Sequence, residues 1–372
     1  MIVYALLTII TSLIALRINN HYVKLQYGYS RQQVLNGLCL VSVFLLLFGV
    51  SALRLNVGND YATYVEYFHL IRCKLDTEVV VPTEPGFNLV CLLIYFISGK
   101  TENYLLMFAV FAFVTIFLFL KGMYRQSDNF FMTFFLFMTL GYYFQTFSTV
   151  RYYLALAIAF VSIPYVLNKE WLKFFILILV GATFHKSLLI VLPLYFLAQW
   201  TYRKWHFAIA ALVCGTFIFF KDFYMKLFYV IYPTYEDVTI ADSSNLIAIA
   251  RCVAVLVFAL LMFGEIKDDR RLKFYFYCNL GAIALYVFCS FLPSVSRAAY
   301  YLSITHILFV PALIGRIKSD KIRTAIKILV IVGGIGYFTV FLLYKASSDG
   351  LRILPYQTFL FHDMVSILSE VG

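Results

Sequence analysis

Long apolar runs, separated by short polar segments, follow one another along almost the whole chain. A helix that crosses a bilayer needs about 20 mostly apolar residues, within a range of about 17–25. Twelve runs approach this length, although several need flanking residues to reach it. The pattern therefore predicts an all-α, polytopic integral membrane protein. The predicted spans are 1–16, 34–53, 104–120, 129–147, 151–167, 171–184, 187–200, 206–220, 246–263, 274–292, 298–314 and 324–344.

A further apolar run, 85–98, is too short for a full crossing and favours a re-entrant or interfacial segment. Loop charges decide between these readings. If the N-terminus is outside and this segment does not cross, six short loops and their adjoining helix ends become cytoplasmic and hold 18 of the 30 Lys and Arg residues. This is the positive-inside bias, and a crossing at 85–98 would reverse it. The cytoplasmic loops are then 17–33, 121–128, 168–170, 201–205, 264–273 and 315–323.

The composition supports the membrane assignment. The chain is 63% hydrophobic and 13% charged, whereas a soluble domain carries about 25% charged residues. The net charge of +11 is explained by basic cytoplasmic loops, so no nucleic-acid partner is expected. The seven cysteines form no CxxC pair and the six histidines lack metal-ligand spacing, so we expect no disulfide framework, metal or cofactor.

These boundaries define one transmembrane domain, 1–372, with outer loops 54–103 and 221–245 and an outer tail, 345–372. The first run has no basic n-region and no small-residue cleavage site, so we expect a retained first helix.

Four arginines from separate parts of the sequence all fall on the predicted outer side: Arg54, Arg151, Arg251 and Arg297. Arg251 lies several residues inside an apolar run, where a charge is costly and rarely faces lipid. The planar guanidinium stays charged and donates two parallel hydrogen bonds, which suits phosphate oxygens. The four together predict a site for an anionic lipid headgroup such as a diphosphate. Considered singly, Arg54 could reach to the interface and Arg251 could pair with a carboxylate.

Three candidate general bases fall on the same predicted side: Asp60, Glu84 and His185. Each has a structural alternative. Asp60 could cap the helix that follows it, Glu84 could simply precede a helix N-terminus, and His185 could be a packed, hydrogen-bonded residue. Asp60 follows Gly58 in a loop that could approach a substrate closely, so we rank Asp60 first, His185 second and Glu84 third.

Six short motifs follow one another along the chain: Arg54-x-x-x-Gly58-x-Asp60-Tyr61-x-x-Tyr64, Glu84-Pro-Gly-Phe, Arg151-Tyr-Tyr-Leu-Ala, Phe184-His185-Lys186-Ser187, Arg297-x-x-Tyr300-Tyr301 and Pro355-Tyr356. In this order they resemble the EpsG family, whose members are similar to Wzy-type polymerases of bacterial exopolysaccharides, capsules and O-antigens.

This resemblance implies a GT-C-like membrane glycosyltransferase in the bacterial inner membrane, with its active site facing the periplasm or cell exterior. Its substrate would be an oligosaccharide on undecaprenyl diphosphate. The enzyme would transfer the glycan to a sugar hydroxyl of another lipid-linked unit, without a metal. A flippase and a chain-length regulator are the protein partners that such a reaction suggests.

Other functions fit a polytopic chain. An O-antigen-ligase-like transferase would use the same donor with a different acceptor. A membrane O-acyltransferase would place His185 at the centre of its chemistry and leave the outer arginines without a purpose. A transporter would spread its ionisable groups across both leaflets, and a scaffold would need none of them.

Overall fold

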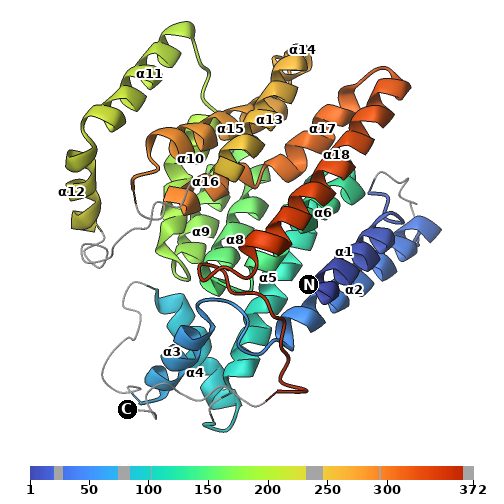
Figure 1. Cartoon of the computed structure of the whole chain (residues 1–372), viewed down its shortest axis with the longest axis vertical. Helices are drawn as coiled ribbons and strands as arrows, with labels where there is room; N and C mark the ends of the chain where they lie inside the picture. Colours follow the sequence, from blue (N-terminus) through green and yellow to red (C-terminus); the bar gives the residue numbers. More distant parts are fainter. Residues whose placement is uncertain (21–27, 74–83, 102, 232–245, 293–294, 363–372) are drawn as a thin grey trace. The chain divides into compact units, whose positions relative to one another are not determined.

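The computed structural model describes residues 1–20, 28–73, 84–101, 103–231, 246–292 and 295–362. Every regular element within these residues is a helix (Figure 1), and the one bridge between extended segments joins Arg54 to Thr358. This agrees with the predicted all-α class.

The first helices are α1 (Ile2–Ala15), α2 (Arg31–Ala52), α3 (Tyr61–Cys73), α4 (Pro85–Ile97), α5 (Tyr104–Gln126), α6 (Phe130–Thr139), α7 (Tyr142–Gln145), α8 (Val150–Leu167) and α9 (Trp171–Ala182). A 3-10 turn (Lys186–Ile190) precedes α10 (Val191–Ala198), α11 (Lys204–Phe219), α12 (Lys221–Ile231), α13 (Leu246–Leu261), α14 (Phe263–Ile266), α15 (Arg270–Phe288), α16 (Val295–Ser303), α17 (His306–Arg316), α18 (Asp320–Val340) and a π-helical turn (Phe341–Lys345).

Each of the twelve predicted spans falls on a helix or on consecutive helices. By length and composition, five helical segments of the described chain are able to cross a membrane, or six if α11 and α12, bent by 86°, count as one span. The five are Arg31–Ala52, Tyr104–Gln126, Val150–Leu167, Val295–Arg316 and Asp320–Lys345. Six further apolar helices, such as Ile2–Ala15 and Trp171–Ala182, are shorter. The protein is therefore an all-helical membrane protein, and the count of twelve spans stays a prediction.

Lipid-facing stripes are visible along individual helices. In α1, Ile2, Leu6, Ile9 and Leu13 are exposed at helical spacing, while Tyr4 on the opposite side is buried. A soluble protein would rarely leave such a stripe open to water. The exposed apolar side chains are the surface that the bilayer covers.

The chain forms two compact units. The first contains 1–162, 176–188 and 314–372, and the second contains 163–175 and 189–313. In the second unit α15 packs against α10, α11, α13 and α16. The prediction of one transmembrane domain concerns the whole chain and stays a prediction.

The predicted span 129–147 is not one continuous helix. Helix α6 ends at Thr139, and Gly141 has a φ of +78°, a left-handed conformation that suits glycine, before the short α7 begins. A Cβ on Gly141 would lie 2.9 Å from the ring of Phe341. The break follows from this backbone conformation and close packing, which an apolar run does not reveal.

The end of α2 meets the start of α5 in the first unit. The guanidinium carbon of Arg54 lies 4.9 Å from the ring centre of Phe108, in the second turn of α5, and the Tyr61 ring stacks on Phe108 at 4.3 Å. Helices α3 and α4 pack against each other and against α5 at this end. If α4 is re-entrant, the chain does not cross the membrane between α2 and α5, and the end of α2 and the start of α5 lie on the same side. The contact between these two ends is expected in that case.

The C-terminal tail pairs with the loop that follows α2. The Leu55 N–H donates to Gln357 O at 3.0 Å, and the Gly58 N–H donates to Arg352 O at 2.8 Å. The hydroxyl of Tyr356 donates to Val50 O at 3.0 Å. The tail and the Arg54 loop therefore lie on the same side of the membrane. Within the predicted outer loops and tail, residues 74–83, 102, 232–245 and 363–372 lie outside the described residues.

Cysteine labelling tests the topology. In a cysteine-free background, Lys100→Cys and Asp349→Cys place single thiols at two exposed positions. If α4 does not cross, as predicted, and the tail shares the side of residue 54, both should react with an impermeant maleimide added outside cells. Lys318→Cys, on the predicted cytoplasmic side, should react only after permeabilisation. Protection of Lys100→Cys from the external reagent would show that α4 crosses.

Candidate functional site

Glu84 and Arg151 form an ion pair at the beginning of α4. Glu84 is the residue before the helix and is 5% exposed, and the Nη1 of Arg151 donates to its Oε2. Pro85 occupies the first helical position, where its missing N–H costs nothing. The pair joins the start of α4 to the first turn of α8. Two residues that are distant in sequence thus hold each other's charge in a nearly closed environment.

Three aromatic rings surround the guanidinium of Arg151. Its carbon lies 5.0 Å from the ring centre of Phe87, 5.3 Å from that of Tyr64 and 5.5 Å from that of Tyr67. Rings at this distance attract a cation through their negative faces. The Nε atom of Arg151 is buried and has no hydrogen-bond acceptor among the described residues. A buried donor without an acceptor is uncommon and requires an explanation.

His185 lies beside the same ion pair. It is 8% exposed, and its Nδ1 is 3.6 Å from Oε1 of Glu84. The Ser187 N–H donates to Nδ1 at 3.3 Å, so in this arrangement the neutral ring carries its proton on Nε2. The Tyr152 ring contacts the imidazole edge-on at 5.6 Å.

Gly86 allows the segment that contains Glu84 to pack closely against the segment that contains His185. Its N–H donates to Thr183 O at 2.9 Å, and a Cβ on this residue would lie 2.3 Å from the Thr183 hydroxyl oxygen. Only glycine allows the two backbones to approach so closely. This contact brings Glu84 and His185 to the same point.

A second glycine docks the loop that carries Asp60. Gly58 has a φ of +112°, and a Cβ there would lie 2.2 Å from Phe147 O. The neighbouring Asn59 accepts a hydrogen bond from the Ser148 hydroxyl. The loop is thereby fixed against the turn that leads into α8, close to Arg151.

Asp60 is half-buried just before α3. Burial raises the pKa of Tyr64, the Arg151 guanidinium lowers it, and the negative charge of Asp60 raises it further. The Tyr64 hydroxyl also accepts from the Arg151 N–H at 3.4 Å. Asp60 therefore belongs to the same electrostatic environment as Arg151. We call the set Asp60, Tyr64, Glu84, Arg151 and His185 the Arg151 cluster.

Arg54 has different surroundings. It is 1% exposed, its Nη1 donates to the backbone and hydroxyl oxygens of Ser51, and its guanidinium lies over the rings of Phe108 and Phe147. Burial lowers its pKa, and nearby tyrosines oppose this shift. No described carboxylate pairs with it. In this structure Arg54 is enclosed and holds the end of α2 against the tail and α5.

Arg251 and Arg297 belong to the second unit. Arg251, in α13, donates from Nη2 to the Ser303 hydroxyl at 3.3 Å, and its guanidinium carbon lies 5.8 Å from the ring centre of Tyr300. Arg297, Tyr300 and Ser303 recur every three residues along α16 and so share one face. Arg297 therefore lies on the face of α16 that Arg251 approaches.

A buried polar network fixes the residue next to Arg251. The side-chain amide of Asn279 donates to Cys252 O at 3.1 Å, and its carbonyl oxygen lies 2.8 Å from Nε2 of His306. Asn279 and His306 are 0% and 1% exposed. The network connects α13, α15 and α17, and it holds the backbone next to Arg251 in place.

Three polar residues at these places were not among the predicted site residues: Arg352, Asn279 and His306. Arg352, in the tail, donates to Asn56 Oδ1 at 3.3 Å and adds a cation to the Asp60 loop. Arg352 lies three residues before the Pro355-Tyr356 motif, and this proximity could have marked it as a candidate. Asn279 and His306 stand alone in apolar runs and carried no signal beyond their polarity.

The candidates thus divide into three sets. Asp60, Glu84, Arg151 and His185 gather in the first unit, Arg54 is enclosed nearby, and Arg251 and Arg297 occur in the second unit. Within the described residues, no group of three His, Cys, Asp or Glu side chains is arranged to hold a metal ion. Their roles in binding and catalysis stay predictions.

Comparisons with curated proteins and with solved structures found no match. A comparison with protein families matches the EpsG family over residues 37–358, which is most of the 372-residue chain. The matched region contains every residue of the Arg151 cluster as well as Arg54, Arg251 and Arg297. The chain therefore belongs to the EpsG family, membrane proteins related to Wzy-like polysaccharide polymerases.

Proposed function

We propose that this protein is a membrane glycosyltransferase that polymerises a bacterial surface polysaccharide. It transfers a glycan from undecaprenyl diphosphate to a sugar hydroxyl of another lipid-linked repeat unit. Membership of the EpsG family and the membrane-spanning helices support this proposal. The observation that carries it is the half-buried cation of the Arg151 cluster, whose buried Nε has no acceptor among the described residues and lies beside candidate bases.

Arg151 is suited to hold the departing diphosphate. Its Nη1 is committed to Glu84, which fixes the guanidinium, while the Nε donor is left for an anionic ligand. A donor that is already oriented, in a site with little water, stabilises charge that develops in the transition state. Glu84 then acts as a positioning residue for Arg151.

We assign the general base to Asp60. Asp60 lies in the loop that Gly58 docks against Phe147, and a loop residue can approach the acceptor hydroxyl closely. The Asp60 carboxylate takes the proton of the acceptor hydroxyl, whose oxygen attacks the anomeric carbon. The bond from that carbon to the diphosphate oxygen breaks, and undecaprenyl diphosphate leaves. A single displacement inverts the anomeric centre, as in inverting glycosidases.

The other arginines complete the proposal. Arg251 and Arg297, on facing helices of the second unit, bind anionic oxygens of a lipid-linked substrate. Arg54 contributes by holding the Asp60 loop in place rather than by touching the substrate. No metal or cofactor is required, since guanidinium groups neutralise the diphosphate charge.

The membrane arrangement belongs to the same proposal. Twelve spans and a re-entrant α4, in a GT-C-like fold, would place both termini and the Arg151 cluster on the outer face of the inner membrane. The meeting of Arg54 with Phe108 supports the re-entrant segment. A flippase would deliver the lipid-linked unit to this face, and a chain-length regulator would act on the product.

Polymerisation can be measured directly. Purified protein incubated with a synthetic undecaprenyl-diphosphate repeat unit should give a ladder of products on a gel. A single addition to a different acceptor, without a ladder, would favour an O-antigen-ligase-like transferase. Transfer of an acyl group that depends on His185 would favour an O-acyltransferase.

Asp60→Asn should lower turnover by about 10²–10⁴, the usual contribution of a general base, while the protein still binds the donor. Glu84→Gln should weaken donor binding as well, because Arg151 loses its partner. Asp349→Asn, an exposed acid in the tail, is the matched control and should leave activity unchanged. If Asp60→Asn turns over within a few-fold of the parent while His185→Gln does not, the base is His185.

Arginine-to-lysine exchange tests the diphosphate set. Arg151→Lys, Arg251→Lys and Arg297→Lys keep the charge but lose the planar fork, so each should lower polymerisation by about tenfold to a hundredfold. Arg323→Lys, the same exchange in an arginine paired with Asp320, serves as the control. The midpoint of thermal unfolding in detergent should be the same for all four variants and the parent. Normal product from Arg251→Lys would assign that residue a purely structural role.

A further inference from the structure

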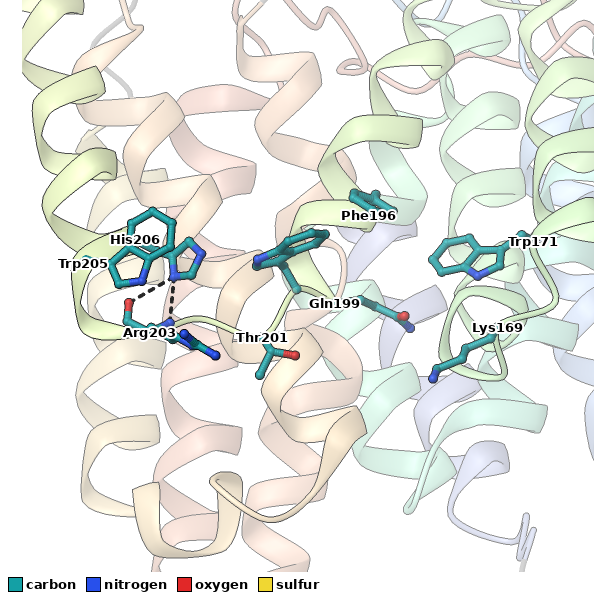
Figure 2. Close-up of a pocket in the computed structure, with 9 residues that line it drawn as sticks. Lys169, Trp171, Phe196, Gln199, Thr201, Arg203, Trp205 and His206 are labelled. Carbon is teal, nitrogen blue, oxygen red and sulfur yellow. Dashed lines mark hydrogen bonds between the residues drawn. The ribbon is translucent and has the colours of Figure 1, made fainter.

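All three tryptophans of the chain line one pocket of the second unit (Figure 2). Trp171 begins α9, Trp200 follows α10, and Trp205 is in the first turn of α11. The pocket has a volume of about 580 Å³. Tryptophan is enriched at the boundary between bilayer and water, because its ring is apolar and its N–H is polar. The three side chains thus mark the level of one membrane surface.

The polar lining of this pocket is positive. Lys169 and Arg203 contribute two charges, and Figure 2 shows their side chains directed toward one another from opposite sides. Arg270 donates to the side chain of Gln199, another lining residue, at 2.9 Å and adds a third cation. None of the nine lining residues, all of them described, is acidic. The pocket therefore favours an anion.

The surface beside the pocket is apolar and open. Leu172 is 74% exposed and Leu197 is 51% exposed, each next to a lining residue. Such side chains suit acyl chains, not water. A ligand that fits both the positive pocket and the apolar surface beside it has a negatively charged head and hydrocarbon chains.

The loops that supply the cations, 168–170 and 201–205, are on the predicted cytoplasmic side. Anionic phospholipids give the cytoplasmic leaflet its negative surface potential, and basic pockets between membrane helices bind their headgroups. We propose that this pocket binds the headgroup of an anionic phospholipid of the cytoplasmic leaflet. The inference stands independently of the polymerase proposal, whose residues are elsewhere in the chain.

Tryptophan fluorescence reports on this pocket alone, because no other tryptophan exists in the chain. The full-length protein is placed in phosphatidylcholine vesicles that contain equal amounts of either acyl-brominated phosphatidylglycerol or acyl-brominated phosphatidylcholine. Bromine quenches nearby tryptophans. The brominated anionic lipid should quench more strongly, showing that it is enriched at the pocket.

Lys169→Ala/Arg203→Ala should lower this preference by about fivefold for each charge removed. Both residues are exposed, so the fold should persist. The matched control is Lys318→Ala/Lys321→Ala, two exposed lysines of another cytoplasmic loop, which should keep the parent's preference.

Three results would overturn the proposal. Equal quenching of the parent by both brominated lipids would mean that the tryptophans only lie at the interface. Equal loss of preference in both double variants would assign it to the general charge of the surface. A change in tryptophan emission caused by inorganic phosphate, in vesicles of phosphatidylcholine alone, would indicate a site for a soluble anion.

Discussion

The hydrocarbon core of a bilayer offers no hydrogen bonds to a polypeptide, and this constraint shapes the rest of the structure. Backbone groups must be satisfied within the chain, so every regular element in the described residues is a helix. Apolar side chains such as Leu6 and Val332 are exposed because lipid covers them. Polar groups inside the helices need internal partners, as the buried contacts among Asn279, His306 and Cys252 illustrate.

The same constraint gives the Arg151 cluster its chemical value. Removing one partner of a buried ion pair costs about 3–5 kcal/mol, because the other charge is left unneutralised. Glu84 and Arg151 therefore hold each other firmly, and the glycine contact at Gly86 keeps their helices close. A charge that is fixed in advance, away from water, interacts strongly with a ligand that carries the opposite charge. In the proposed mechanism, the cluster is thus arranged before any substrate arrives.

Arg54 and Arg151, both predicted to bind a diphosphate, have different surroundings in the structure. Both lie at the end of an apolar run and both contact aromatic rings. Arg54 is covered by the tail and α5 and donates to the adjacent Ser51, whereas Arg151 pairs with a carboxylate beside a histidine. The predicted topology placed the two in one set, because the sequence does not show which segments will cover a side chain.

Hydropathy is a property of about 20 consecutive residues, so the sequence by itself determined the membrane class, the helical segments and the loops that carry basic residues. Its ordered motifs also indicated the EpsG family. Only the tertiary structure decided which distant residues meet: Glu84 with Arg151, 67 positions apart, Arg352 with the Gly58 loop, and the three tryptophans in one pocket. It also decided the break at Gly141. These features arise from packing between segments, and no local window of sequence contains that information.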